Sequence, residues 1–581
     1  MNLISKTEDI LKVVLQKNNF EGESIVLSVS SKPELGQFQY NGAMALAKKM
    51  GINPRAIAEK IVNDLKEYDI FENINIAGPG FINISYTTEF LSQYLTEISA
   101  DMTNNIKKYP SKKVYFDYGG ANVAKALHVG HLRTANIGEA LKRLTKLVGN
   151  EVISDVHLGD IGRQSGMVIF QLREEHPDWV FFDKDYKGEY PKQIPITNDD
   201  LARIYPLAST RAKEDETIME EVRRITAELD RGYEPYVKLW NIIRKISVDN
   251  IKKTYDGLNA KFDLWEGEMD SYPYIEEMLD ILKKSDCLVE SEGALVCDVK
   301  EETDKSEMPP LVVIKTDGTT LYATRELATI LSRVKRFSPD EMIYVVDNRQ
   351  GMYFEQVFRT AYKSGLVSKD FKFQFIGIGT MNGKDGKPFK TRDGGVMKLD
   401  SLLSEIKEET SKYVKSNEEM STEEQEDVSN KVAVAALKYA DLIPNVEKDY
   451  IFDLSKFCSL EGKTGPYILY SAVRMKSLLA KAGESNYTMH NIYSQTEKEL
   501  ITKVLEMPIR IDKAYRNKTL SEITEYIYEI DSLFNKFYAE NRILTEEDEK
   551  KKQTWLFITN LAYQANKMLL DVLAIEIPER M

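Results

Sequence analysis

The stretch that decides the fold runs from Ala121 to Arg133 and reads A-N-V-A-K-A-L-H-V-G-H-L-R. It lies between a β-prone run, Val114 to Asp117, and a helical pattern, Leu132 to Val148. A strand that turns directly into a helix presents free N–H groups and the positive end of the helix dipole, and both suit a phosphate. The stretch therefore predicts a phosphate-binding turn in an α/β fold.

Two of the five histidines of the chain lie in this turn. His128 and His131 are three residues apart, so both imidazoles are expected on one side of the first helical turn. Gly130 leaves room for a flat ligand close to the backbone. The alternative is that one histidine caps the helix and the other is packed inside.

The H-V-G-H motif resembles the HIGH signature of class I aminoacyl-tRNA synthetases, and Asn122, Lys125 and the pair Leu132-Arg133 resemble its arginyl-tRNA synthetase form. The resemblance implies that His128 and His131 contact the phosphates of ATP and stabilise charge as pyrophosphate leaves. Preorganised donors of this kind contribute about 3 kcal/mol each. Nucleotidylyltransferases that form adenylates also use HxGH, so the rest of the chain must discriminate.

Composition is that of a soluble protein. The chain has 581 residues, 42% hydrophobic and 29% charged, which predicts several globular domains. No apolar run approaches the ~18 residues of a membrane span. The segment Met1 to Asn19 has the pattern of an amphipathic helix rather than of a signal peptide. We therefore expect no membrane partner and a cytoplasmic location.

The net charge of −14 argues at first sight against RNA, but local fields govern docking. Lys142, Arg143 and Lys146 form one candidate basic track, whose alternative is a plain solvated face.

The three cysteines are widely spaced and form no CxxC. Neither a disulfide framework nor a cysteine zinc site is therefore expected, and a reducing compartment is the simplest expectation. The three cysteines are Cys287, Cys297 and Cys458.

The order of patterns predicts three domains. Residues 1–105 read as a small α+β unit with a hairpin around Gly78-Pro79-Gly80. Residues 106–452 alternate strands and helices, as in a doubly wound, Rossmann-like parallel sheet, with a helical insertion at about 174–258 and a loop-rich link from 372. Residues 453–581 read as all-helical. Further predicted strands are 152–155, 311–314 and 342–346, and residues 404–431 are predicted to form a solvated, partly mobile helix.

The N-terminal unit resembles the extra domain that arginyl-tRNA synthetases place on the tRNA elbow. The resemblance rests on E-L-G-Q-F-Q-Y-N at 34–41 and G-P-G-F-I-N at 78–83. It implies that Phe38, Tyr40 and Asn83 contact tRNA. The alternative is an ordinary packing domain in which Phe38 and Tyr40 fill the core.

A second glycine-rich loop, H-L-G-D-I-G-R-Q-S-G at 157–166, resembles the family's N-H-x-G-D-W-G-x-Q-F-G. The resemblance implies that Gly159 and Asp160 lie beside ATP. Ile161 and Ser165 replace the family's Trp and Phe, so the packing is expected to differ. The alternative is a simple glycine turn.

Recognition of free arginine requires planar carboxylate acceptors around the guanidinium. Asp117 ends the predicted strand, and Tyr322 to Glu326 (Y-A-T-R-E) resembles the family's Y-x-T-R-D. Many members carry Glu where Asp117 stands and Asp where Glu326 stands, so we hypothesise a reciprocal swap of one short and one long acid. For each acid alone, an exposed salt bridge is the alternative. The full pocket implied by the resemblance is Asp117, Asn122, His128, Tyr322, Glu326 and Gln350.

A lysine-rich loop, G-K-D-G-K-P-F-K-T-R-D-G-G at 383–395, resembles the degenerate KMSKS loop of this family. The resemblance implies that Lys387, Lys390 and Arg392 close on the triphosphate and that Lys125 compensates for the degenerate motif. The alternative is a glycine-rich hairpin with solubilising lysines.

The helical end resembles the anticodon-binding domain of the family. The segment E-G-K-T-G-P-Y-I-L-Y at 461–470 matches E-G-x-T-G-P-Y-x-Q-Y except at Leu469, and the chain ends P-E-R-M. The resemblance implies that Tyr467, Tyr470 and Met581 contact the anticodon loop, where stacking of an unpaired base contributes ~1–3 kcal/mol. The alternative is that these tyrosines belong to the core.

The resemblance covers nearly the whole chain in the right order. It implies that L-arginine and ATP form arginyl-adenylate and that arginine passes to the 3′ adenosine of tRNA-Arg, releasing AMP and pyrophosphate. Mg²⁺ is expected to arrive with ATP, without a metal held by the protein, and the chain is expected to be a monomer. The rivals are a cysteinyl-tRNA synthetase, which needs a zinc site, a small adenylate-forming ligase, which needs no flanking domains, and an RNA-binding paralogue without catalysis.

Overall fold

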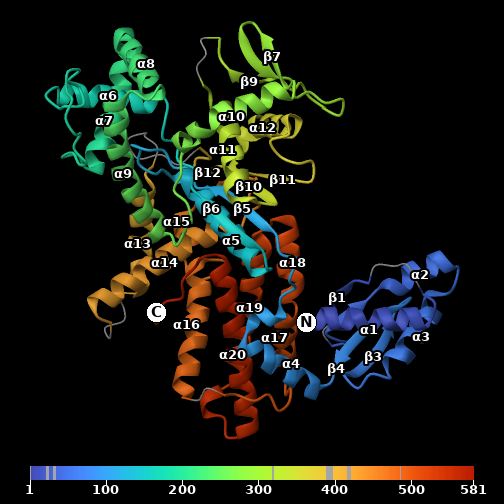
Figure 1. Cartoon of the computed structure of the whole chain (residues 1–581). Helices are drawn as coiled ribbons and strands as arrows, with labels where there is room; N and C mark the ends of the chain where they lie inside the picture. Colours follow the sequence, from blue (N-terminus) through green and yellow to red (C-terminus); the bar gives the residue numbers. More distant parts are fainter. Residues whose placement is uncertain are drawn as a thin grey trace.

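The computed structural model describes residues 2–20, 25–30, 34–316, 320–387, 397–414, 420–483 and 486–581. At the N-terminus a four-stranded antiparallel sheet has the order β1-β2-β4-β3, and the hairpin predicted from Gly78-Pro79-Gly80 is its β3–β4 turn. Figure 1 shows this unit to one side of the rest of the chain. Its elements are α1 (Leu3–Lys17), β1 (Leu27–Val29), β2 (Phe38–Tyr40), α2 (Gly42–Met50), α3 (Pro54–Leu65), β3 (Phe71–Ala77) and β4 (Phe81–Tyr86).

The central sheet is parallel and has the strand order β11-β10-β5-β6. Along the chain β5 is the first strand of this sheet, yet it lies inside the sheet. The order therefore reverses between β5 and β10, where open α/β sheets bind ligands beyond the carboxyl ends of their strands. The register pairs Asp117 with Tyr344 on one side and with Asp155 on the other. The elements are β5 (Lys113–Tyr118), α5 (Val129–Leu147), β6 (Glu151–Asp155), α11 (Tyr322–Phe337), β10 (Glu341–Asp347), α12 (Gly351–Ser364) and β11 (Lys372–Ile378).

Two predictions about this sheet are wrong. The predicted strand 311–314 forms, but as β9 (Leu311–Ile314) of a separate antiparallel sheet with β7 (Leu288–Ser291) and β8 (Ala294–Cys297). The region from 372, predicted as a loop-rich link, begins with β11, an edge strand whose side chains are only partly buried at first. Its K-F-Q-F start alternates polar and apolar residues, as a half-buried strand does.

The predicted insertion is largely helical. Trp240 is fully buried within it and its indole Nε1 donates to the carbonyl of Asp160, which fastens the insertion to the second glycine-rich loop. Figure 1 shows these helices beside the upper end of the central sheet. They are α6 (Arg163–Glu175), α7 (Asn198–Glu214), α8 (Glu216–Asp230) and α9 (Glu234–Gly257), followed by η2 (Glu268–Ser271) and α10 (Tyr272–Lys284).

The C-terminal part of the described chain is helical, as predicted. The described residues of 404–431 do not form one solvated helix: they divide mainly between α13 (Leu399–Val414) and α14 (Thr422–Leu442), which pack on each other and bury Leu402, Ile406 and Val432. The following helices are α15 (Leu454–Phe457), α16 (Gly465–Ala482), α17 (Gln495–Leu505), α18 (Met507–Asn517), α19 (Ser521–Glu540) and α20 (Glu549–Val572). The remaining elements are the helix α4 (Thr88–Ala100) and five short ones: η1 (Met102–Asn105), η3 (Asn348–Gln350), β12 (Met381–Asn382), β13 (Tyr450–Ile451) and η4 (Ile543–Thr545).

The expectation of no disulfide is wrong for one pair. Cys287 and Cys297 are bonded, with 5.5 Å between their Cα atoms. The antiparallel pairing of β7 and β8 places Cys297 opposite Leu288 and hence beside Cys287, which linear spacing does not reveal. Cys458 is a free, buried thiol. None of the described helices is both long and apolar enough to cross a bilayer.

Candidate active site

The two histidines of the motif form the start of α5. His128 is the N-cap residue, and its Nδ1 accepts a hydrogen bond from the backbone N–H of Gly130 at 3.0 Å. His131 Nδ1 accepts from the backbone N–H of His128 at 3.1 Å, and the ring centroids are 3.9 Å apart. Both imidazoles thus lie on one side, as predicted. The alternative also describes real contacts, because one ring caps the helix and the other is only 8% exposed.

The capping contacts fix which nitrogen of each ring can donate. A neutral imidazole whose Nδ1 accepts carries its hydrogen on Nε2. Burial and the charge of Lys125 lower the pKa of His128, and burial together with His128 lowers the pKa of His131 to about 3. Both rings are therefore neutral at pH 7. They offer Nε2–H donors at a helix N-terminus, the arrangement that an oxyanion of ATP needs.

Gly130 cannot be replaced without moving this turn, since a Cβ there would lie 2.8 Å from the ring of His128.

Lys125 Nζ lies 4.7 Å from the ring centroid of Tyr205 in α7, so the insertion holds the lysine of the motif. Lys387 is exposed. The predicted triphosphate contacts of Lys390 and Arg392 lie outside the described residues.

The structure brings the two predicted nucleotide loops together. Val123 N donates to Gly159 O at 3.1 Å, and Gly159 N donates to Ala121 O at 2.9 Å. A Cβ on Gly159 would lie 2.5 Å from the side chain of Asn122, so only glycine fits there. Asp160 is engaged internally: it is fully buried, with Arg244 Nε at 3.0 Å and the N–H of Met269 at 3.0 Å. These contacts do not favour ATP binding by Asp160, which stays a prediction.

An acidic cluster lies at the carboxyl ends of β5 and β6. Arg333 of α11 reaches both strands, with Nη2 2.7 Å from Asp117 Oδ2 and 3.1 Å from Asp155 Oδ2. His157 Nε2 lies 4.0 Å from Glu326 Oε2, and its Nδ1 lies 3.8 Å from Asp155. Asp117 and Glu326 therefore share one cluster, but a guanidinium of the chain itself already neutralises Asp117. The sequence reasoning missed Asp155 and Arg333.

The charges of this cluster do not cancel. Burial opposes the charged form of His157, but Asp155, Asp117 and Glu326 outweigh it and raise the pKa of His157 to about 9. When Glu326 is ionised, three carboxylates therefore face two cations. Burial raises the pKa of Glu326, whose Oε1 is buried without a hydrogen-bond partner in the described structure. The cluster is one positive charge short, and a bound guanidinium would supply it.

Two other predicted pocket residues, Tyr322 and Gln350, have exposed side chains. Tyr322 is 60% exposed and its ring lies 5.0 Å from the guanidinium of Arg325. Gln350, at the start of α12, is exposed. Arg325 Nε pairs with Glu268 at 2.6 Å, which adds a buried carboxylate that the sequence reasoning missed because W-E-G-E-M-D follows no periodic pattern.

The predicted tRNA contacts of the N-terminal unit are interior residues. Phe38, Tyr40 and Asn83 have no exposed surface. The side chain of Asn83 accepts a hydrogen bond from Gln39 Nε2 and donates one to Asn75 Oδ1. The alternative of a packed core fits Phe38 and Tyr40, which share a face of the sheet with Ile82 and Ile84. Asn83 lies on the opposite face, between Gln39 and Asn75. This burial does not favour tRNA contact by Phe38 and Tyr40, and the tRNA contacts of all three residues stay predictions.

The predicted anticodon contacts are partly accessible. Tyr470 is 40% exposed and its ring lies 4.6 Å from the guanidinium of Arg474. The hydroxyl of Tyr467 accepts from Asn535 Nδ2 at 3.1 Å. Met581 is partly buried against the helical core, and the neighbouring Arg580 pairs with Glu424 at 2.8 Å.

Family models match almost all of the chain. Residues 4–86 match the arginyl tRNA synthetase N terminal domain, residues 94–454 match the catalytic domain of class I (R) tRNA synthetases, and residues 468–581 match the DALR anticodon binding domain.

Full-length relatives give the same result. An arginine–tRNA ligase of Alkaliphilus oremlandii is 45% identical over 100% of both chains. One of Agathobacter rectalis is 43% identical over 100% of this chain and 99% of its own. The solved arginyl-tRNA synthetase of Thermus thermophilus, 22% identical, has the same fold, with a TM-score of 0.81 and 100% of each chain covered. The chain therefore belongs to the arginyl-tRNA synthetases of class I.

Proposed function

We propose that the chain joins L-arginine to tRNA-Arg in two steps. Arginine and MgATP give arginyl-adenylate and pyrophosphate, and the arginyl group then passes to the 3′ adenosine of the tRNA with release of AMP. The single observation that carries the first step is a pair of features at the carboxyl end of β5: neutral Nε2–H donors where the chain continues into α5, and an acidic cluster one positive charge short. The first feature suits the leaving pyrophosphate and the second suits the side chain of arginine.

We further propose roles for the individual residues. His128 and His131 donate to phosphate oxygens, while Lys125 and Lys387 add charge near the triphosphate. Glu326 accepts hydrogen bonds from the guanidinium of the substrate arginine. Asp117 holds Arg333 in place and so positions the acidic cluster. The other proposed arginine contacts are Asn122, Tyr322 and Gln350, and those to ATP include Gly130 and Gly159. Catalysis then consists of positioning and charge stabilisation, with little covalent work for the protein.

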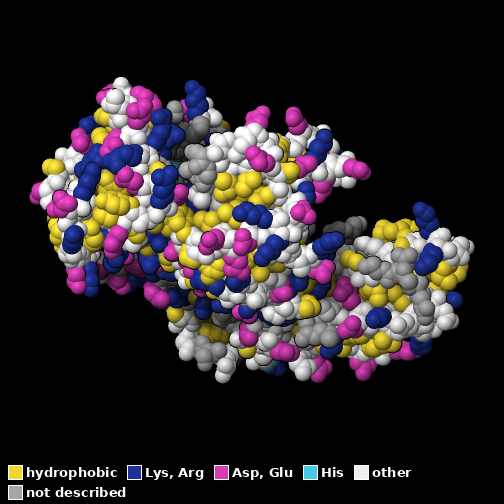
Figure 2. All heavy atoms as spheres, turned by 45° about the horizontal axis from the view of Figure 1, so that its top comes forward, with side chains coloured by type: hydrophobic (Ala, Val, Ile, Leu, Met, Phe, Trp, Pro, Cys, Tyr) yellow, Lys and Arg dark blue, Asp and Glu magenta, His cyan; other side chains and the backbone are white. Residues whose placement is uncertain are grey.

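The domain boundaries, the tRNA contacts, the oligomeric state and the cellular location are part of the same proposal. We place the elbow-binding domain at 1–105, the catalytic domain at 106–452 and the anticodon-binding domain at 453–581. Tyr467, Tyr470 and Met581 contact the tRNA, the chain acts as a monomer in the cytoplasm, and Mg²⁺ enters with ATP. Figure 2 shows Lys and Arg side chains interspersed with Asp and Glu over the face it presents, so the net charge of −14 does not make this face uniformly acidic.

ATP–pyrophosphate exchange tests the proposal. Purified protein is assayed with arginine, lysine or cysteine, each with and without a tRNA-Arg transcript, and esterification of the transcript is measured in parallel. Arginine alone should support exchange and esterification. Retained tRNA binding without exchange under any condition would indicate a catalytically inactive RNA-binding protein instead.

A further inference from the structure

A cavity of about 580 Å³ lies between α5 and α20. Its lining comes from residues 103 and 108, the second half of α5, residue 152 of β6, residues 261 and 263, and the end of α20. Lys142, Arg143 and Lys146, the candidate basic track of the sequence, belong to this lining, and the proposed function gives them no role. We call this space the α5–α20 cavity.

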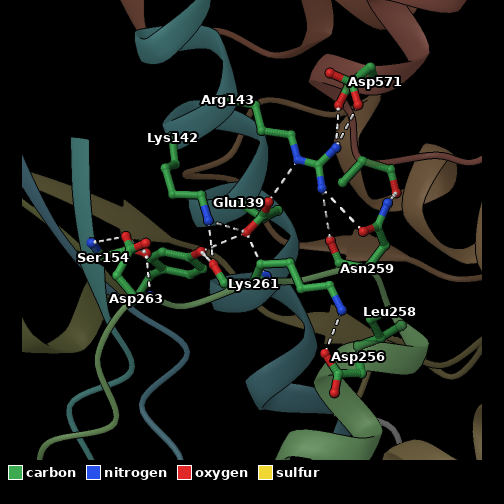
Figure 3. Close-up of polar contacts among 12 residues, drawn as sticks. Glu139, Lys142, Arg143, Ser154, Asp256, Leu258, Asn259, Lys261, Asp263 and Asp571 are labelled. Carbon is green, nitrogen blue, oxygen red and sulfur yellow. Dashed lines mark hydrogen bonds and ion pairs between the residues drawn. The ribbon is translucent and has the colours of Figure 1, made fainter. Parts of the chain in front are cut away.

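Positive charge predominates in the lining of the α5–α20 cavity. The lining contains five lysine or arginine side chains and three carboxylates, in a chain whose net charge is −14. Glu139 already pairs with Lys142 at 2.8 Å and with Arg143 at 2.7 Å, and Asp571 pairs with Arg143 at 2.8 Å. Figure 3 shows Glu139 bonded to both cations and Arg143 extended toward Asp571. These two acids therefore do not neutralise the other lysines.

The third carboxylate of the lining, Asp263, is held by β6. Its Oδ2 accepts from the backbone N–H and from the hydroxyl of Ser154, both at 2.8 Å, as Figure 3 shows. Burial lowers the pKa of Lys142, and the neighbouring carboxylates Glu139 and Asp263 do not restore it. The cavity is thus short of negative charge even beside its own acids.

Three lysines have no carboxylate partner within the lining. Lys108 Nζ donates to the carbonyl of Leu147 at 2.6 Å. Lys146 is exposed, and none of the ion pairs between described residues involves it. Lys261 pairs with Asp256, which lies outside the lining, and both side chains are more than half exposed, so this pair is weak. These three ammonium groups are available to a ligand.

The alternative is that the lysines only offset the dipole of α5, because cations in the last turn of a helix are stabilised there. Lys146 lies in the last turn of α5 and fits this alternative. Lys108 precedes β5 and Lys261 follows α9, so neither belongs to the helix. Burial lowers the pKa of Lys108 although the charge of Asp101 opposes the shift. The convergence of three segments on one cavity therefore needs another explanation.

The rest of the lining indicates the kind of ligand. It includes the apolar side chains of Leu147, Val152, Met568 and Val572, which a bare ion would leave unused. The volume lies within the range of about 300–1,000 Å³ that is usual for small organic ligands. The planar fork of Arg143 is occupied, so the available donors are ammonium groups, which bind phosphate as point charges.

The surrounding acids favour a compact anion over a long one. Asp571 belongs to the lining and its side chain is 74% exposed, and Asp256 beside Lys261 is 61% exposed. An extended polyanion that passed over the opening would meet both negative charges. A compact anion can reach the lysines without covering these carboxylates.

We propose that the α5–α20 cavity binds a small phosphate ester of about nucleotide size. Its phosphate lies among Lys108, Lys146 and Lys261, and its less polar body lies against the apolar side chains of the lining. None of the residues proposed to contact arginine or ATP lines this cavity, so the site does not depend on the proposed function.

Photolabelling of the full-length protein with 8-azido-AMP tests the proposal. After digestion with an acid-specific protease, mass spectrometry quantifies the labelled peptides and separates residues 142–152 and 568–572 from the region of His128. Lys146→Ala and Lys108→Met each remove one ammonium group, and methionine keeps most of the apolar stem of Lys108. The matched control is Lys283→Ala, which removes an exposed lysine from the last turn of α10.

In the wild type, label should appear on the cavity peptides and should be suppressed by AMP but not by the same concentration of adenosine. Each cavity variant should raise the concentration for half-maximal cavity label about tenfold or more, because a hydrogen bond between charged groups is lost. Label around His128 should change less than about twofold, and Lys283→Ala should match the wild type.

Four results would overturn the proposal: no label at the cavity, unchanged labelling in both variants, an equal loss in Lys283→Ala, or equal suppression by adenosine. Stronger suppression by a short RNA than by AMP, at the same concentration of nucleotide, would also overturn it, because the ligand would then be an RNA backbone. Thermal melts of each variant within a few degrees of the wild type confirm that the comparison concerns folded protein.

Discussion

Replacing Glu326 by Gln removes one charge from the acidic cluster without changing its shape. Asp117 and Asp155 share the guanidinium of Arg333, at 2.7 and 3.1 Å, so neither has a full charge left for a ligand. The ion pair that the described residues give Glu326 is with His157, at 4.0 Å, and Asp155 shares this histidine. Glu326 is therefore the carboxylate that a substrate guanidinium would meet, and Gln in its place leaves that guanidinium buried with no net counter-charge.

The size of the effect follows from that charge. Removing one partner of a buried ion pair costs about 3–5 kcal/mol. At about 1.4 kcal/mol per factor of ten, kcat/KM for arginine should fall roughly 10²- to 4 × 10³-fold. Citrulline, a neutral analogue of nearly the same shape, leaves the Glu326 charge unmet in the wild type. Its kcat/KM should change less than about tenfold in the variant, so discrimination between the two amino acids should fall by at least ~10-fold.

ATP–pyrophosphate exchange with tRNA-Arg present measures both substrates on one preparation, and citrulline serves as the internal control for folding. A thermal melt within a few degrees of the wild type confirms that the cluster is intact. Equal losses for arginine and citrulline would refute the reasoning, because they would show that Glu326 shapes the site rather than recognising a cation.

Three other changes have clear expected outcomes. The pKa of His157 is raised to about 9, so the stabilisation that its protonated ring gives is complete below the unfolded value of 6.5 and is lost as pH rises through 9. In the wild type, the free energy of unfolding should therefore fall between pH 6.5 and 9. In His157→Gln this fall should be smaller, as measured by urea titrations at several pH values. Lys125→Met should slow adenylate formation ~10²-fold while leaving arginine affinity unchanged, measured by exchange and dialysis; near-normal exchange would remove Lys125 from the mechanism. Burial raises the pKa of the Asp531 carboxyl well above its usual value, so the native protein holds this proton more tightly than the unfolded chain and stability falls as pH rises above about 4. Asp531→Asn should add about 1–3 kcal/mol to the free energy of unfolding at pH 8 and little at pH 4. A lower free energy of unfolding at pH 8 would contradict this.

The elements that periodicity or a turn signal marks could be predicted from sequence. β5 and α5 lie on either side of the motif as expected, and Pro54 starts α3. The rings of His128 and His131 meet because residues three apart share a helical face. These features depend on local spacing, which a sequence displays directly.

Features that depend on pairing distant segments could not be predicted in this way. Arg333 follows Glu326 by two helical turns, and nothing local marks it as the partner of Asp117. The Cys287–Cys297 bond depends on a hairpin, and Phe38 and Asn83 are interior only because β2 and β4 pair. A resemblance marks which residues matter to a family, but side-chain direction must come from the fold.

The internal guanidinium of Arg333 changes how the two acids of the pocket are to be understood. If Asp117 and Glu326 shared the substrate, exchanging their lengths would be compensatory. With Asp117 bound to Arg333, lengthening it pushes against a buried arginine, whereas shortening Glu326 withdraws a carboxylate from the ligand. Asp117→Glu should therefore lower stability and Glu326→Asp should lower arginine affinity, and the double variant should show both losses added rather than recovered. Recovery of arginine activation in the double variant would instead place both acids on the substrate and leave Arg333 as a neighbour that gives way.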